Sequence, residues 1–285
     1  MNNLKKLLPI LLSLAMLSAC GGDDSSGKTS SSEAVNSSEP SSSESTTSSD
    51  TESSETEDSS EADGTLPEGS VYAEFTNGMP VEGWECSDGW TNGSVFNVTW
   101  RKSNVTFKGG NMQLIVDKDK TPADGIPYSG GEFRTLGFYG YGRYEVSMKA
   151  IKNDGVVSSF FTYTGPYDNN PWDEIDVEIL GKDTTKVQFN YFTDSKGEHE
   201  YMHDLGFDAS EDFHTYAFEW YEDKIIWYVD GTEVHRATEN IPSTKGKIMM
   251  NAWCGKDVDD WLSPFDDKNI PLTAEYEWIK YTPFN

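Results

Sequence analysis

The stretch Trp172-Asp173-Glu174-Ile175-Asp176-Val177-Glu178-Ile179-Leu180 decides the fold class, because acidic and aliphatic residues alternate along it. Successive side chains of a β-strand point to opposite faces of the sheet. Glu174, Asp176 and Glu178 therefore share one face, and the aliphatic residues that follow each of them pack on the other. The stretch predicts a strand with a row of three carboxylates on one side.

Similar short runs on both sides of this stretch extend the prediction to a whole domain. They are rich in Val, Ile, Phe, Tyr, Trp and Thr, as strands are, and Val229-Asp230-Gly231-Thr232 has the composition of a hairpin turn. The runs are Asn111–Val116, Gly142–Met148, Val156–Thr162, Lys186–Phe192, His214–Trp220, Lys224–Val229, Lys247–Trp253 and Ala274–Tyr281. With about a dozen strands and no repeat of 20–50 residues, an all-β, two-sheet antiparallel β-sandwich is favoured over a propeller.

Charge separates this domain from the first part of the chain. The 285 residues carry a net charge of −27, and residues 23–63 hold 12 acidic residues, one lysine and no aromatic residue. Two further lysines lie in residues 1–22, which leaves −18 to residues 64–285. A chain this acidic repels nucleic acids and anionic membranes. The Ser/Thr-rich acidic segment has too few apolar groups to fold alone, so we expect a disordered spacer.

The N-terminus reads as a secretory signal, with Lys5 and Lys6 before an apolar run that is too short to span a bilayer permanently. Leu17-Ser18-Ala19-Cys20 resembles a bacterial lipoprotein processing site, which implies removal of residues 1–19 and acylation of Cys20. The alternative is an ordinary signal in which Cys20 is incidental. We expect residues 20–65 to link a lipid anchor on a bacterial cell surface to a catalytic domain at 66–285.

The carboxylate row suits one kind of chemistry. Cα atoms four residues apart in a strand are about 13 Å apart, and side chains that lean toward a bound substrate can approach the roughly 5–5.5 Å separation of a retaining glycosidase. One glutamate would attack the anomeric carbon and the other would protonate the leaving oxygen, with Asp176 separating their pKa values. The alternatives are a calcium site, which usually comes from Gly- and Asn-rich loops, and a solvated acidic face.

The chain resembles the bacterial lichenases, endo-β-1,3-1,4-glucanases of glycoside hydrolase family 16, over roughly residues 70–283. The resemblance is carried by Asp173–Tyr191, Ser158–Pro166, Leu205–Ser210, His214–Phe218, Trp227–Gly231, Asn240–Thr244, Gly246–Asn251 and Val258–Leu262. It implies a concanavalin A-like jelly roll with a glucan cleft on its concave sheet. It also implies that Glu174 is the nucleophile, Glu178 the general acid/base, and Asp176 the residue that tunes the nucleophile.

The resemblance further implies a set of substrate-binding positions, in which aromatic rings stack on sugars and polar groups bind hydroxyls. They are Asn92, Glu132, Arg134, Phe161, Tyr163, Trp172, Asn190, Trp253 and Trp261. Core packing is the alternative for each aromatic residue, and Phe160 and Phe161 must face opposite ways. Phe192 stands where the family carries a cleft tyrosine, so one hydroxyl contact is missing.

The sequence gives weaker signals for metal sites and disulfides than for the carboxylate row. The family implies a structural calcium held largely by backbone carbonyls, at positions that match Gly110 and Glu277, and no required cofactor. The disulfide of Bacillus-type lichenases is absent, because Val98 and Gly130 occupy its positions. Pairing of Cys86 with Cys254 stays open. The four histidines show no useful ligand spacing, so no zinc site is expected.

The leading hypothesis is a secreted, cell-surface, monomeric enzyme that hydrolyses β-1,4 bonds in mixed-linkage β-1,3-1,4-glucan with retention. Activity on xyloglucan is an alternative, because xyloglucan enzymes share the Glu-x-Asp-x-Glu spacing. Laminarin hydrolysis is disfavoured, since laminarinases typically carry an extra residue before the second glutamate, which bulges the strand. A non-catalytic glucan-binding lipoprotein would be free to lose the three acids, and all three are present.

Overall fold

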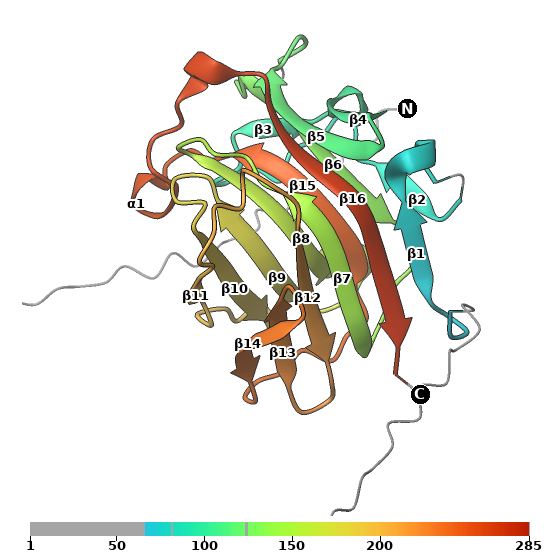
Figure 1. The fold of residues 1–285 in the computed structure, drawn as a ribbon. Helices are drawn as coiled ribbons and strands as arrows, with labels where there is room; N and C mark the ends of the chain where they lie inside the picture. The colour runs from blue at the N-terminus through green and yellow to red at the C-terminus, as the bar shows by residue number, and fades with distance from the viewer. Residues whose placement is uncertain (1–65, 81, 123–124, 285) are drawn as a thin grey trace, which may run out of the picture. The chain divides into compact units, whose positions relative to one another are not determined.

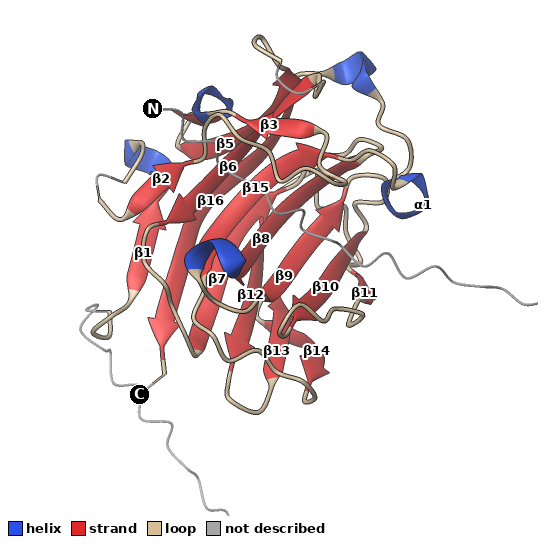
Figure 2. Cartoon of the chain, turned by 180° about the vertical axis from the view of Figure 1, so that it is seen from behind, coloured by secondary structure: helices blue, strands red, loops and turns tan. Residues whose placement is uncertain are grey.

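A computed structural model describes residues 66–80, 82–122 and 125–284 of the chain. The signal sequence, Cys20 and the acidic segment lie outside these residues, so the predictions made for them stay predictions. The described part is almost entirely β-structure (Figure 2). Its one α-helix, α1 (Asp259–Leu262), has four residues, and the described chain contains no helix that is long and apolar enough to cross a membrane.

Sixteen strands form two layers, which confirms the predicted sandwich (Figure 1). The pairing runs β11-β10-β9-β8-β15-β6 through one layer and continues β5-β16-β7-β12-β13-β14 through the other. All pairs are antiparallel except β3 with β6. The first layer contains β2 (Trp84–Cys86), β6 (Tyr128–Thr135), β8 (Val156–Thr164), β9 (Asp173–Leu180), β10 (Lys186–Phe192), β11 (Tyr201–Asp204) and β15 (Lys247–Cys254).

The second layer contains the remaining long strands of the path. They are β5 (Asn111–Lys118), β7 (Gly142–Lys149), β12 (His214–Trp220), β13 (Ile225–Val229), β14 (Thr232–Ala237) and β16 (Leu272–Pro283), flanked by β1 (Val71–Glu74) and β4 (Val105–Lys108). The predicted hairpin joins β13 to β14, and Asp230 and Gly231 have the positive φ angles, 47° and 78°, that such a turn requires.

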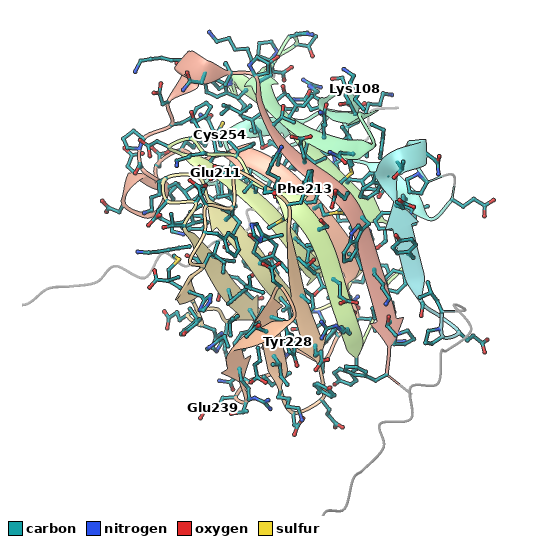
Figure 3. The ribbon with its side chains drawn as sticks, in the orientation of Figure 1. Lys108, Glu211, Phe213, Tyr228, Glu239 and Cys254 are labelled. Atoms are coloured by element: carbon teal, nitrogen blue, oxygen red, sulfur yellow. The ribbon has the colours of Figure 1, made fainter. Side chains whose placement is uncertain are left out.

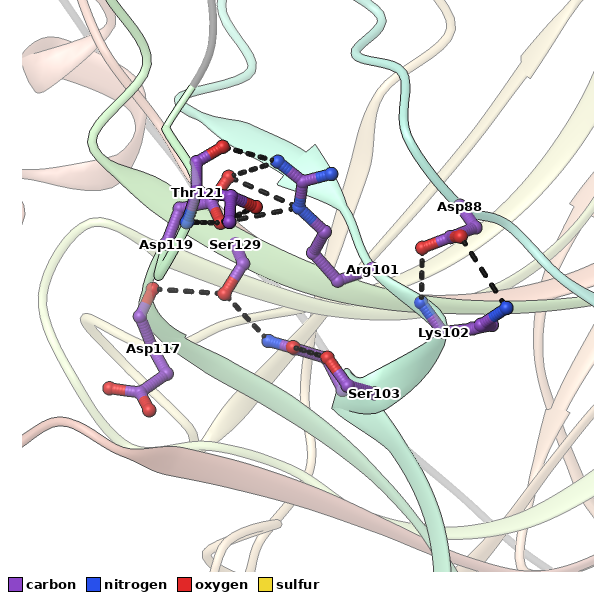
Figure 4. Close-up of polar contacts among 9 residues, drawn as sticks. Asp88, Arg101, Lys102, Ser103, Asp117, Asp119, Thr121 and Ser129 are labelled. Carbon is purple, nitrogen blue, oxygen red and sulfur yellow. Dashed lines mark hydrogen bonds and ion pairs between the residues drawn. The ribbon is translucent and has the colours of Figure 1, made fainter.

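The layers are joined where β5 pairs with β6 and β3 (Val98–Trp100) adds a parallel partner to β6. Polar side chains tie this corner together (Figure 4). The Arg101 guanidinium donates to the Asp119 carboxylate at 2.7 Å and to the Thr121 carbonyl at 2.7 Å. Asn104 donates to the Ser129 hydroxyl at 2.9 Å, which fixes the turn after β3 against β6.

The core lies between the layers and is closed by aromatic rings from both. Phe160 of β8 packs on Phe218 of β12, with ring centroids 5.8 Å apart, and Phe189 of β10 stacks on Trp227 of β13 at 5.6 Å. The Trp227 indole also donates to the backbone carbonyl of Asp176 at 3.2 Å. Residues of the second layer thus contact and stabilise β9, the strand that carries the carboxylates, on its core side.

Both described cysteines are free, which answers the open question about Cys86 and Cys254. Cys86 lies opposite Phe133, and Phe133 lies opposite Met250 of β15. Cys254, labelled in Figure 3, is four residues further along β15, about 13 Å at ~3.3 Å per residue. A disulfide needs Cα atoms within about 7 Å, so this register keeps the thiols apart.

Candidate active site

The predicted carboxylate strand is β9, at the centre of the first layer. Directly opposite residues of paired strands share a face. Tyr163 of β8 lies opposite Glu174, Phe161 lies opposite Asp176, and Asn190 of β10 lies opposite Asp176 from the other side. Three of the predicted substrate-binding residues therefore stand on the face that carries the three carboxylates, which we term the carboxylate face.

The same register carries this face across β15 to β6. Glu178 lies opposite Ser159, Ser159 opposite Asn251, and Asn251 opposite Glu132. Two residues away along the same strands, a second row runs parallel to the first and contains Asp176, Phe161, Met249 and Arg134. The side chains of these two rows are thus aligned at right angles to the strands. Such an alignment suits an extended polymer that crosses the sheet.

Glu174 is held by the ring of Trp172. The Trp172 indole Nε1 donates to Glu174 Oε2, and its ring stacks on Phe192 with centroids 4.6 Å apart. Burial raises the pKa of Glu174 to about 7, while the hydrogen bonds from Trp172 and Asp176 act in the opposite direction. Trp172 therefore contacts Glu174, the predicted nucleophile, and Phe192 supports the Trp172 ring although it lacks the hydroxyl implied by the family resemblance.

Glu178 has different surroundings. Gln188 Nε2 donates to Glu178 Oε2 at 2.8 Å, and Trp261 Nε1 donates to Gln188 Oε1 at 3.0 Å. Burial raises the pKa of Glu178 to about 8, and the negative charges of Glu174 and Glu200 add to this effect. Sequence reasoning missed Gln188, since only the β9–β10 register brings it to Glu178.

Asp176 lies between the two glutamates and is 5% exposed. Burial, followed by the charges of Glu174 and Glu178, raises its pKa well above the ordinary value. A protonated Asp176 can donate to Glu174, which stabilises the ionised form of that residue. The row can therefore hold an ionised Glu174 beside a protonated Glu178, as the sequence analysis expects of an acid/base pair.

Glu132, Arg134 and Asn92 lie toward the β2 end of the face. Glu132 is buried, accepts from the Ser87 hydroxyl at 2.6 Å, and has a pKa raised by its burial. Arg134 Nε donates to Glu85 at 2.8 Å, and its guanidinium lies 5.4 Å from the Trp90 ring. Asn92 accepts from the Trp100 indole at 2.6 Å, so its amide nitrogen is left for a ligand.

Of the aromatic residues predicted to bind substrate, some lie outside the core on the carboxylate face and one packs with the core. Phe161 and Trp172 are each 8% exposed and stand outside the core between the layers, whereas Phe160 belongs to that core, as the alternation predicts. Trp253 shares the face of Asn251, but the ring of Phe96 covers it at 4.1 Å and Trp261 lies 6.0 Å away. Trp253 is 3% exposed and packs with the core.

Asp173, at the start of β9, is a second residue that the sequence analysis passed over. Its buried carboxylate accepts hydrogen bonds from the backbone amides of Asp194, Ser243 and Thr244 at 2.9–3.0 Å. These amides belong to two loops that flank the Glu174 end of the strand. Asp173 therefore anchors both loops beside Glu174.

Gly110 and Glu277, the predicted calcium positions, lie in the second layer, where β16 passes from pairing with β5 to pairing with β1. Gly110 is in the two-residue turn that joins β4 to β5, and Glu277 is the extra residue at a β-bulge in β16. A turn and a bulge both interrupt the strand ladder, and backbone carbonyls at such places can serve as calcium ligands. Among the described residues, no cluster of three or more His, Cys, Asp or Glu side chains is placed to hold a metal.

The arrangement corresponds to a known family of proteins. Residues 92–280 match the profile of glycosyl hydrolases family 16. The chain belongs to this family. Family 16 structures share its jelly-roll fold, in agreement with the predicted sandwich.

Individual family 16 members are similar over most of the described domain. A Ruminococcus flavefaciens xylanase/beta-glucanase is 61% identical over 199 residues, covering 68% of this chain and 25% of that protein. An Acetivibrio thermocellus beta-glucanase is 58% identical over 214 residues, covering 75% of this chain and 62% of that protein. The chain thus matches a quarter of the length of the Ruminococcus flavefaciens protein and about three fifths of the length of the Acetivibrio thermocellus protein.

A solved family 16 structure agrees with the sequence matches. The crystal structure of a prokaryotic β-1,3-1,4-glucanase (lichenase) derived from a mouse hindgut metagenome has a TM-score of 0.73 and 53% sequence identity. The alignment covers 75% of this chain and 99% of that structure. Similarity at this level supports the use of family 16 chemistry to interpret the carboxylate face.

Proposed function

We propose that the chain is an endo-β-glucanase that hydrolyses β-1,4 bonds in mixed-linkage β-1,3-1,4-glucan with retention of configuration. The observation that carries the proposal is the row on β9. It contains two glutamates with different hydrogen-bond donors and an aspartate between them. A binding protein has no need for such a row, because closely spaced carboxylates repel one another and are costly to bury.

The proposed reaction has two steps. In the first, a Glu174 oxygen forms a bond to the anomeric carbon while the glycosidic C–O bond breaks, and the Glu178 proton moves to the leaving oxygen. In the second, Glu178 takes a proton from water, the water oxygen bonds to the anomeric carbon, and the ester bond to Glu174 breaks. Two inversions at one carbon give retention.

Each neighbour has a part in these steps. The Trp172 indole and protonated Asp176 hold Glu174 ionised for attack and accept its return as a leaving group. Gln188 fixes the orientation of Glu178 through the 2.8 Å hydrogen bond. Glu132, Arg134 and Asn92 offer acceptors and donors to sugar hydroxyls, and Phe161 and Tyr163 offer apolar surface beside the reacting bond.

One observation favours mixed-linkage glucan over both alternatives, and a second favours it over laminarin alone. The name of the solved relative at 53% identity gives β-1,3-1,4-glucan as its substrate. In addition, β9 pairs with β8 and β10 in unbroken register, with no extra residue between Glu174 and Glu178. Laminarin and xyloglucan remain the alternative substrates.

We also propose that residues 1–19 form a signal peptide and that acylated Cys20 anchors a monomer at a bacterial cell surface. Residues 20–65 would then link this anchor to a catalytic domain at 66–285. A calcium ion bound by carbonyls of Gly110 and Glu277 would tie the β4–β5 turn to β16. Chelation should then lower the melting temperature, and added calcium should restore it.

The proposed activity is tested by incubating the purified chain with barley β-glucan, laminarin and xyloglucan. Barley β-glucan should yield short oligosaccharides, and the Glu174→Gln variant should yield none under the same conditions. A folded chain that cleaves only laminarin or xyloglucan would contradict the substrate assignment. Binding of barley glucan with no cleavage at any pH would instead favour the non-catalytic alternative.

A further inference from the structure

A second concave feature lies away from the carboxylate face, between the two free edges of the sandwich. Strands β11 and β14 are the two ends of the pairing path, and they approach each other on one side of the molecule (Figures 1 and 2). A groove of about 610 Å³ runs between them. We define this edge groove by Tyr201, His203 and Phe207 on one side and Asp230, Thr232 and Glu233 on the other.

The edge groove is separate from the proposed active site. Alternate residues of β11 point to opposite faces, and Met202 lies opposite Gln188, which contacts Glu178. Tyr201 lies opposite Phe189, a core residue, so its side chain is on the other face. A ligand in the edge groove would therefore not occupy the carboxylate face.

The chemistry of the groove suits a sugar. The Tyr201 ring stacks on His235 at 3.8 Å on one side and is 38% exposed, and the Phe207 ring is fixed by stacking on His214 at 3.5 Å. These rings supply pre-ordered apolar surface for the C–H face of a pyranose. Thr232 and His203 add groups that can donate to or accept from hydroxyls, and free strand edges offer unpaired backbone amides and carbonyls.

The negative charge around the edge groove limits which ligands can bind there. Residues 64–285 carry −18, and Asp230 and Glu233 border the groove, so an anionic polymer would be repelled. Both carboxylates already have cationic or polar partners, since Asp230 bonds to His214 at 2.8 Å and Glu233 to Arg236 at 3.0 Å. A neutral, hydroxyl-rich ligand meets no such penalty, and 610 Å³ is within the range of ligand sites.

We infer that the edge groove is an accessory binding site for a segment of neutral β-linked glucan. This inference rests on the proposed function, because it assigns a second contact to the same polymer. A long chain held at both places would raise the effective concentration of its bonds at the carboxylate face. Short oligosaccharides, which reach only one place, would gain nothing.

The test compares Tyr201→Ala and Thr232→Arg with the parent chain and with Tyr72→Ala. Tyr72 is an exposed tyrosine on β1, which pairs with β16 and serves as a matched control. With barley β-glucan, both groove variants should raise KM about threefold to tenfold, the loss expected for one ring contact, and leave kcat unchanged. With a short chromogenic oligosaccharide, kcat/KM should match that of the parent.

Retention of the variants on immobilised barley glucan, measured in a Glu174→Gln background, should fall by a similar factor. Unchanged KM and retention in both groove variants, with a parent that does cleave barley glucan, would overturn the inference and leave the proposed function intact. A parent that neither binds nor cleaves this glucan would overturn both. A dimer in analytical ultracentrifugation that Thr232→Arg dissociates would show that a second copy of the chain occupies the groove.

Discussion

Replacing Gln188 by leucine should raise the pKa of Glu178 and move the alkaline limb of the pH–rate profile. The 2.8 Å hydrogen bond from Gln188 Nε2 favours the ionised form of Glu178, whose pKa is about 8 with the bond in place. A hydrogen bond to a charged group contributes about 1.5–3 kcal/mol, and one pKa unit corresponds to about 1.4 kcal/mol. Because Glu178 is half-buried and water replaces part of the bond, we expect a rise of about one unit.

The measurement is kcat/KM on barley β-glucan from pH 5 to pH 10, which reports on the free enzyme. Gln188→Leu should stay active about one pH unit further into the alkaline range than the parent. Glu200→Gln is a matched control of opposite sign, because the Glu200 charge raises the pKa of Glu178 and its removal should move the limb down. An alkaline limb that stays in place in both variants would refute Glu178 as the acid.

Three further changes test the same site. Trp172→Phe removes the indole donor that lowers the pKa of Glu174, so the acidic limb should rise from about 7 by roughly one pH unit, measured from the same pH–rate profile. Asp173→Ala leaves three backbone amides without an acceptor and should lower the free energy of unfolding in urea by about 3 kcal/mol, with Asp173→Asn losing less. Glu178→Gln should raise it by about 2 kcal/mol at pH 9 and not at pH 4, because folding raises the pKa of Glu178 to about 8, and the parent loses stability as pH rises from the unfolded-state value of about 4.3 to that folded-state value. A gain at pH 4 alone would contradict this sign.

Periodicity was sufficient to predict the strand that matters most. The alternation in residues 172–180 predicts both the strand and the face of each side chain, and β9 begins one residue later, at Asp173, and ends at Leu180 as predicted. Lys186–Phe192 and His214–Trp220 were likewise predicted with the bounds that the structure shows. Alternating side chains depend only on local backbone geometry, so one sequence is enough to read them.

Contacts between strands could not be read in this way. Gln188 meets Glu178 and Asn251 meets Glu132 only because particular strands pair in a particular register. Trp253 is a second example. Its face could be predicted from the alternation, but its contact with Phe96, which lies in a loop distant in the sequence, could not. Asp173 was passed over because its partners are backbone amides, which leave no residue-specific signal in the sequence.

The most direct test of the central claim is the anomeric configuration of the glycosyl azide formed when azide rescues each glutamate variant on an aryl β-glucan oligosaccharide. Glu178→Ala keeps the nucleophile, so azide should displace it from the second face and give the β-azide. Glu174→Ala lacks the nucleophile, so one direct attack should give the α-azide. Exchange of the two products between the variants, or the same product from both, would contradict the roles assigned to Glu174 and Glu178.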